Sequence, residues 1–71
     1  MDEKVIKVFA DNFNMSVSQI SIETRLQEDL QANSMHMFGL LAMLEGELGS
    51  APEPASAMSM ATVQDFIDFY K

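Results

Sequence analysis

The 71-residue sequence holds eleven acidic and four basic residues, which give a formal net charge of −7, and 48% of its residues are apolar. A chain this acidic repels phosphate backbones and anionic lipid, so we expect neither nucleic acid nor a membrane among its partners. The apolar content is too high for a disordered acidic tail, and the lack of cysteine excludes disulfides, thiolate nucleophiles and sulfur-based zinc sites.

The length predicts a single domain over residues 1–71 with a lean core, because folding at this size removes only about 60% of the surface of the unfolded chain. We find no basic leader with a cleavage site and no apolar stretch long enough to span a bilayer. The sequence therefore predicts a cytoplasmic protein, which we expect to be a monomer.

The first segment, residues 2–13, predicts an amphipathic helix. Two acidic residues stand in its first turn, where the helix dipole favours negative charge. Its apolar residues recur at helical spacing and are Val5, Ile6, Phe9 and Phe13.

Residues 14–32 predict a long ordered loop, because single apolar residues are separated by polar ones in a pattern that fits neither helix nor strand. We expect a short helical turn near residues 25–29. The residues expected to pin the loop to the core are Val17, Ile20, Ile22, Leu26 and Leu30. Loops of this length inside small domains are often functional.

The second helix is expected to begin at Asn33 and Ser34 and to stop at Gly49. It is the most apolar segment of the chain. Its apolar residues recur at helical spacing and are Met37, Leu40, Leu41, Leu44 and Leu48.

Pro52 and Pro54 interrupt the chain, so residues 55–60 can form at most one or two helical turns. Residues 62–65, Thr-Val-Gln-Asp, resemble a capping box that opens a last helix. The apolar stripe of this helix is Val63, Phe66, Ile67 and Tyr70. The sequence thus predicts an all-α four-helix bundle with three main helices, a short third helix and a long first loop.

Ser34 lies where the long loop meets the most apolar helix, so we expect its hydroxyl to be exposed beside unpaired backbone N–H groups. A phosphodiester at this position would lie in the field of a helix N-terminus, which favours negative charge. The alternative is a plain helix cap, which would contribute about 1 kcal/mol to stability. The local sequence leaves both roles open.

Residues 28–35, Glu-Asp-Leu-Gln-Ala-Asn-Ser-Met, resemble the Glu-Asp-Leu-Gly-Ala-Asp-Ser-Leu signature of the acyl carrier protein family, in which the serine carries phosphopantetheine. Residues 24–26 resemble part of the first loop of the family, residues 44–48 its Leu-Glu-x-Glu-Phe helix end, and residues 62–64 the opening of its last helix. The resemblance therefore covers the whole chain at matching spacing.

The resemblance implies a four-helix carrier with no catalytic activity of its own. A phosphopantetheinyl transferase would use coenzyme A to attach a 4'-phosphopantetheine arm to Ser34, and the terminal thiol of the arm would hold an acyl group as a thioester. The other implied partners are acyl-transferring or condensing enzymes of fatty acid, polyketide or related biosynthesis. The apolar interior beside the second helix would shelter the acyl chain.

The chain departs from the family pattern around this serine. Asn33 stands where the family usually has Asp, Met35 replaces Leu, and His36 and Gly39 occupy positions that are often acidic. No acid occurs from residue 30 to residue 44, so the acids lie at the two ends of the second helix. We therefore expect a specialised carrier with dedicated partners. The residues expected to contact partners are Asn33, Met35, His36, Phe38, Glu28, Glu45 and Glu47.

Gly39 and Gly46 each cost the second helix about 1 kcal/mol relative to alanine. Close approach of the arm or of a partner would justify them, and ordinary tolerance of glycine is an equal alternative.

Two other functions stay open, namely an unmodified interaction module that keeps the carrier fold, and a carrier of aminoacyl or peptidyl groups. The strong negative charge favours acyl cargo. Copper binding by Met35, His36 and Met37 is disfavoured, because adjacent helical residues point in different directions. His36 has no nucleophile or acid at motif spacing, so we expect a surface histidine, no metal site and no enzyme activity.

Overall fold

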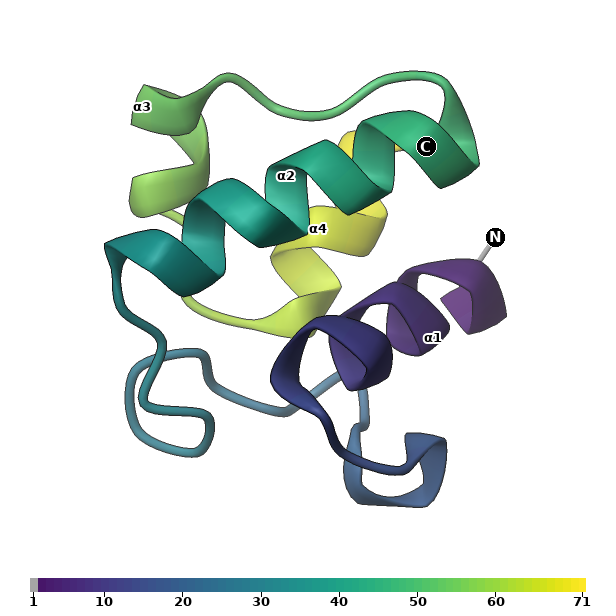
Figure 1. Ribbon diagram of the computed structural model, residues 1–71, viewed down its shortest axis with the longest axis vertical. Helices are drawn as coiled ribbons and strands as arrows, with labels where there is room; N and C mark the ends of the chain where they lie inside the picture. Colours follow the sequence, from purple (N-terminus) through teal and green to yellow (C-terminus); the bar gives the residue numbers. More distant parts are fainter. Residues whose placement is uncertain (1) are drawn as a thin grey trace.

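The computed structural model describes residues 2–71 and shows a small bundle of helices around one apolar core (Figure 1). In chain order the elements are helix α1 (Asp2–Phe13), the 3-10 helix η1 (Val17–Gln19) and helices α2 (Ser34–Leu48), α3 (Pro54–Met58) and α4 (Val63–Phe69). Residues 2–71 form no strand, and the predicted all-α fold is confirmed. Among these residues no helix combines the length and apolar character that crossing a membrane requires.

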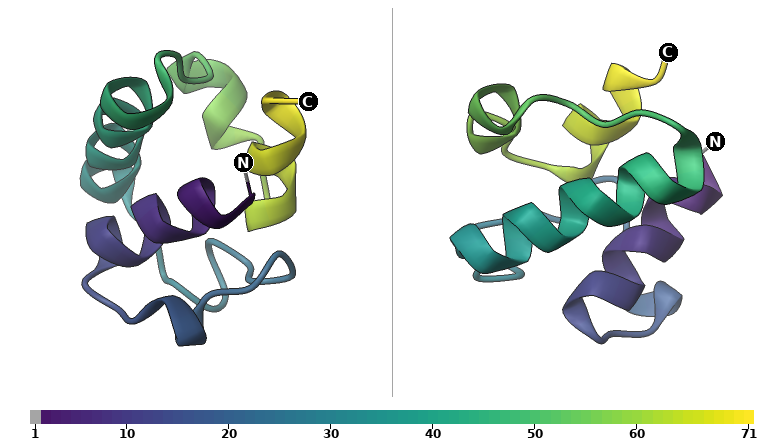
Figure 2. Two further views of the ribbon diagram at one scale, coloured as in Figure 1. Left: turned by 90° about the vertical axis from the view of Figure 1, so that its right-hand side faces the viewer. Right: turned by 45° about the horizontal axis from the view of Figure 1, so that its top comes forward.

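The centre of the core is an aromatic pair between α1 and α4. The rings of Phe9 and Phe66 are both fully buried and meet edge to face, with their centroids 5.2 Å apart. Figure 2 shows α1, α2 and α4 arranged around this interior. Ile6 and Phe13, which the periodicity of α1 placed on its apolar stripe, are only half-buried and pack at the edge of the core.

Local caps fix both ends of α2. Asn33 is the residue before the helix, and Gly49 ends it in the left-handed conformation, with φ at 84°. Four of the five residues of the predicted apolar stripe are buried, and the fifth, Leu48, is half-buried against the core; the four are Met37, Leu40, Leu41 and Leu44. The boundaries expected from the sequence are therefore confirmed.

The predicted turn near residues 25–29 is also confirmed. The Asp29 N–H donates to the Arg25 carbonyl (2.9 Å), and the Asp29 carboxylate accepts from the Arg25 N–H (2.8 Å). This turn is joined to the entry of α4, because the Val63 N–H donates to the Thr24 carbonyl (3.0 Å). The loop is thereby held close to the end of the bundle where α2 begins.

Two of the five apolar residues predicted to pin the loop do not do so. Ile20, Leu26 and Leu30 are buried, but Val17 is 54% exposed and Ile22 is 42% exposed. Val17 belongs to η1, which was not predicted. Ile22 contacts the bundle through its backbone, since its carbonyl accepts from the Gln64 N–H (3.0 Å). The side-chain prediction for these two residues is therefore wrong.

The last two helices follow the expected order. α3 covers Pro54–Met58, one residue earlier at its start and two residues shorter at its end than the predicted segment. The capping box of α4 is confirmed, because Thr62 Oγ1 accepts from the Asp65 N–H (3.3 Å) and Asp65 Oδ2 accepts from the Thr62 N–H (3.1 Å). In Figures 1 and 2, α3 lies at the same end of the molecule as the first turns of α2.

Candidate functional site

Ser34 is the first residue of α2, and its side chain is exposed. The cap position belongs to Asn33, so the alternative in which Ser34 serves only as the helix cap is wrong. None of the side-chain hydrogen bonds within residues 2–71 uses the Ser34 hydroxyl. This hydroxyl is therefore accessible and uncommitted.

The backbone N–H groups at the start of α2 fall into two classes. The Asn33 N–H donates to His36 Nδ1 (3.3 Å), and the His36 N–H donates to Asn33 Oδ1 (2.9 Å). The N–H groups of Ser34 and Met35 have no acceptor among residues 2–71. Two free donors thus lie beside the Ser34 hydroxyl at the positive end of the helix dipole, a setting that favours a phosphate.

No acidic residue opposes this field in the first turn of α2. The nearest preceding acids, Glu28 and Asp29, both pair with Arg25, at 2.7 Å and 3.4 Å. Hydrogen bonds from the backbone and then the side chain of Arg25 hold the pKa of the Asp29 carboxyl below its ordinary value. The two carboxylates are therefore partly balanced by one guanidinium.

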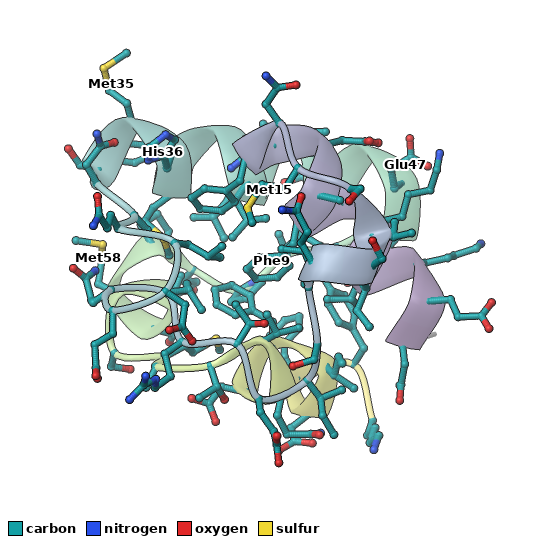
Figure 3. The ribbon with its side chains drawn as sticks, turned by 90° about the horizontal axis from the view of Figure 1, so that it is seen from below. Phe9, Met15, Met35, His36, Glu47 and Met58 are labelled. Atoms are coloured by element: carbon teal, nitrogen blue, oxygen red, sulfur yellow. The ribbon has the colours of Figure 1, made fainter. Side chains whose placement is uncertain are left out.

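Large apolar side chains are exposed in the first turns of α2 and in α3, which lies toward the same end of the molecule. Met35 is 82% exposed, Phe38 is 63% exposed, and Met58 of α3 is 64% exposed. We call these three residues the apolar patch. Figure 3 shows Met35 and Met58 at the same end of the molecule, with Glu47 at the other end. The sequence did not predict Met58, because the exposed side of so short a helix depends on how the helix packs.

The predicted acidic residues lie on either side of this patch rather than within it. Glu28 precedes α2 in the loop, while Glu45 and Glu47 belong to its last turn, and all three are exposed. At 1.5 Å per residue, Glu47 lies roughly 20 Å along α2 from Ser34. The acids therefore stand at the two ends of α2, as expected.

Comparison with known proteins identifies the family. A family model described as "Phosphopantetheine attachment site" matches residues 3–70. The acyl carrier protein of Rickettsia bellii (strain RML369-C) is 31% identical over 71 residues, which are 100% of this chain and 83% of that protein. The acyl carrier protein of Nitratidesulfovibrio vulgaris (strain DP4) is 30% identical over 69 residues, 97% of this chain and 91% of that protein. This chain belongs to the acyl carrier protein family.

Membership of this family makes the chain a carrier rather than a catalyst, and its cofactor is a covalently attached 4'-phosphopantetheine. Attachment through a phosphodiester requires an exposed hydroxyl and surroundings that tolerate an anion. The start of α2 offers both, in the free Ser34 hydroxyl and the two unpaired N–H groups. The residues present therefore fit the group.

Asn33 stands where acyl carrier proteins usually have Asp. The side-chain oxygen of Asn33 caps α2, and an aspartate carboxylate could accept the same hydrogen bond. The difference from the family pattern therefore removes a negative charge beside Ser34 without removing the cap.

His36 is half-buried rather than free on the surface, and α1 provides its neighbours. Its ring lies 4.8 Å from the ring of Phe13, centroid to centroid, and its carbonyl accepts from Asn12 Nδ2 (2.9 Å). The space beside Gly39 is taken by Asn12 as well, since a Cβ at Gly39 would lie 2.9 Å from Asn12 Oδ1. These contacts were not predicted, and the close approach at Gly39 is made within the chain. Gly46 has open space beside it, which fits ordinary tolerance of glycine.

The interior beside α2 is apolar, as expected, but residues 2–71 enclose no cavity in it. An acyl chain could enter only if side chains beside α2 moved apart, so the predicted shelter stays a prediction. Within the same residues, no three histidine or carboxylate side chains come together as a metal site would require.

Proposed function

We propose that Ser34 is the attachment residue for 4'-phosphopantetheine, and that the chain carries acyl intermediates as thioesters in fatty acid, polyketide or related biosynthesis. The observation that supports this most strongly is the uncommitted Ser34 hydroxyl beside two unpaired N–H groups at the start of α2. Residues 1–71 would act as one carrier domain. The cytoplasmic, monomeric state expected from the sequence stays a prediction.

Loading exchanges one phosphorus–oxygen bond for another. The Ser34 hydroxyl loses its proton and forms a phosphodiester with the pantetheine phosphate of coenzyme A, while the phosphoanhydride bond breaks and adenosine 3',5'-bisphosphate leaves. When bound, the arm supplies a terminal thiol for thioester formation.

The chain would assist by electrostatics and by geometry. The N–H groups of Ser34 and Met35 lie at the N-terminus of α2, which is the positive end of its helix dipole. No acidic side chain in the first turn competes with the phosphate for these two donors. The Asn33 cap keeps this turn helical, so the hydroxyl is presented from an ordered backbone.

We also propose that this carrier serves dedicated partners through the apolar patch. Partner enzymes would offer an apolar surface to Met35, Phe38 and Met58, because these side chains are exposed around Ser34 and no acid lies among residues 30–44. Basic residues at the rim of such a partner would reach Glu28 at one end of α2 and Glu45 or Glu47 at the other. Contacts of this kind chiefly set association rate and exclude wrong partners.

The test is intact mass after incubation with coenzyme A and a broad-specificity phosphopantetheinyl transferase. We expect a gain equal to one phosphopantetheine in the wild-type chain and in Ser56→Ala, whose exposed serine lies in α3, but no gain in Ser34→Ala. Circular dichroism of the three proteins should agree, because Ser34 does not cap the helix.

A mass gain that survives Ser34→Ala would overturn the assignment. If the wild-type chain is never loaded, in this assay or when isolated from its own cells, the alternative of an unmodified interaction module replaces the carrier.

A further inference from the structure

We propose that Asn12 of α1 is a positioning residue for the site: it holds the first turns of α2, and with them Ser34, in the geometry that the loading enzyme meets. The proposal rests on Ser34 as the attachment residue. The residue that would position Ser34 lies in α1, which is far from Ser34 in the sequence.

The first observation is a hydrogen bond between the end of α1 and the start of α2. Asn12 Nδ2 donates to the His36 carbonyl at 2.9 Å across 24 residues of sequence, and the bond is partly buried. His36 is the same residue whose N–H and ring Nδ1 complete the cap with Asn33. Asn12 therefore holds the residue that closes the turn carrying Ser34.

The second observation is the glycine that admits this side chain. A Cβ at Gly39 would lie 2.9 Å from Asn12 Oδ1, closer than side chains tolerate, whereas a Cβ at Gly46 would meet nothing within 4 Å. A Cβ at Gly39 would therefore displace the Asn12 amide, and with it the Nδ2 group that is bonded to the His36 carbonyl. Glycine at this position thus leaves room for the Asn12 amide, although it weakens the helix relative to alanine.

The third observation is an aromatic contact next to the hydrogen bond. The Phe13 ring lies 4.8 Å from the His36 ring, so two consecutive residues of α1 hold one residue of α2. His36 and Gly39 are the positions where the sequence lacks the acids expected for partner docking. The contacts of both residues are made to α1, within the molecule.

The test combines three substitutions with a loading assay and hydrogen exchange. Asn12→Ala removes the contact directly. Gly39→Ala displaces Asn12 while improving helix propensity, and Gly46→Ala provides the same propensity gain at an open site. Ile67→Val, in the buried part of α4, is a control for a general loss of stability.

We expect Asn12→Ala and Gly39→Ala each to lower the kcat/KM of loading about fivefold, the factor that one ordinary hydrogen bond provides. In the unmodified protein, exchange of the Met37 and Phe38 amides should quicken by a similar factor, while the Leu44 amide changes less. Gly46→Ala should raise the melting temperature without slowing loading. In the Asn12→Ala background, Gly39→Ala should raise the melting temperature as Gly46→Ala does, because nothing is left to displace.

Equal loading by Asn12→Ala, Gly39→Ala and Ile67→Val would overturn the proposal, as would unchanged exchange at Met37 and Phe38. If Asn12→Ala does not fold, the comparison of Gly39→Ala with Gly46→Ala decides the question alone. If wild type is loaded neither in this assay nor in its own cells, the assignment of Ser34 fails, and the exchange measurements still decide whether Asn12 holds the turn.

Discussion

Asn33, which stands where acyl carrier proteins usually have Asp, keeps the helix cap but removes a negative charge beside Ser34. The cap of α2 uses one side-chain oxygen of Asn33, accepting from the His36 N–H at 2.9 Å, and aspartate has an oxygen in the same place. The amide therefore preserves the helix start while leaving the turn uncharged. A phosphopantetheinyl transferase that serves typical carriers would therefore find the usual backbone geometry at the start of α2, but not the negative charge that aspartate provides.

Changing Asn33 to Asp should accordingly speed loading by such a transferase and leave the fold intact. The added charge lies at the helix N-terminus, where it should stabilise by about 0.3–1 kcal/mol. Loading time courses and thermal melts measure both effects. Asn33→Ala is the control that removes the cap, at a cost of about 1 kcal/mol. Unchanged or slower loading of Asn33→Asp would show that the missing charge is not what limits recognition.

For the helices and loops, the sequence predicted the starts and stops of the longer helices, whereas the short helix η1 was missed although its capping box is local. The start of α2 at Asn33 and Ser34, its stop at Gly49 and the capping box at Thr62 are local, and all three stand where expected, although the capping side chain at the start of α2 is Asn33 and not Ser34. Val17 and Ile22 were placed wrongly because their exposure depends on how the loop packs against the bundle.

At the site too, features set by local sequence were predicted and features set by packing between helices were not. Ser34 and its exposed position followed from a helix start and a motif. The Asn12 contact joins residues 24 apart, and the exposure of Met58 depends on the packing of α3 against α2. Neither could be predicted, because periodicity shows which face of a helix is apolar but not which residues of another helix that face meets.

Tyr70 links the end of α4 to the segment after α2, and its ionisation should make the stability of the fold depend on pH. Its hydroxyl donates to the Ser50 carbonyl (2.8 Å), tying the segment after α2 to the end of α4. Burial raises the pKa of the Tyr70 hydroxyl above its ordinary value. Since the folded state favours the neutral form, this contribution is complete below the ordinary value of about 10 and is lost as pH rises through the raised value.

Melting temperatures measured between about pH 9 and pH 12 should therefore fall more steeply for wild type than for Tyr70→Phe, which cannot ionise. Tyr70→Phe should be the less stable protein near neutral pH, because it lacks the bond to Ser50. Parallel curves for the two proteins would mean that the tyrosine contributes no pH-dependent stability.

Along α2, acidic side chains and the exposed apolar side chains occupy different positions. No acid lies among residues 30–44, and the acids nearest α2 in the sequence are Glu28 and Asp29 before it and Glu45 and Glu47 in its last turn. Long-range attraction would then bring partners near, while the patch decides which of them bind. The first effect is screened by salt and the second is not.

Phe38→Ala should therefore slow acyl transfer with a dedicated partner about thirtyfold at every salt concentration, because loss of an interface hot spot costs about 2 kcal/mol. Its melting temperature should barely change, because Phe38 is 63% exposed. Glu47→Gln should slow the same transfer only at low salt. Equal effects of the two substitutions at moderate salt would mean that docking is electrostatic and that the apolar patch does not select partners.

The attachment residue is tested most directly by fragmentation mass spectrometry of the loaded chain. Six serines besides Ser34 are available, and they are Ser16, Ser18, Ser21, Ser50, Ser56 and Ser59. We predict that the phosphopantetheine mass is found only on the fragment containing Ser34, whether the protein is loaded by a transferase or isolated already modified. Its presence on a fragment that contains any other serine and lacks Ser34 would contradict the assignment of Ser34 as the attachment residue.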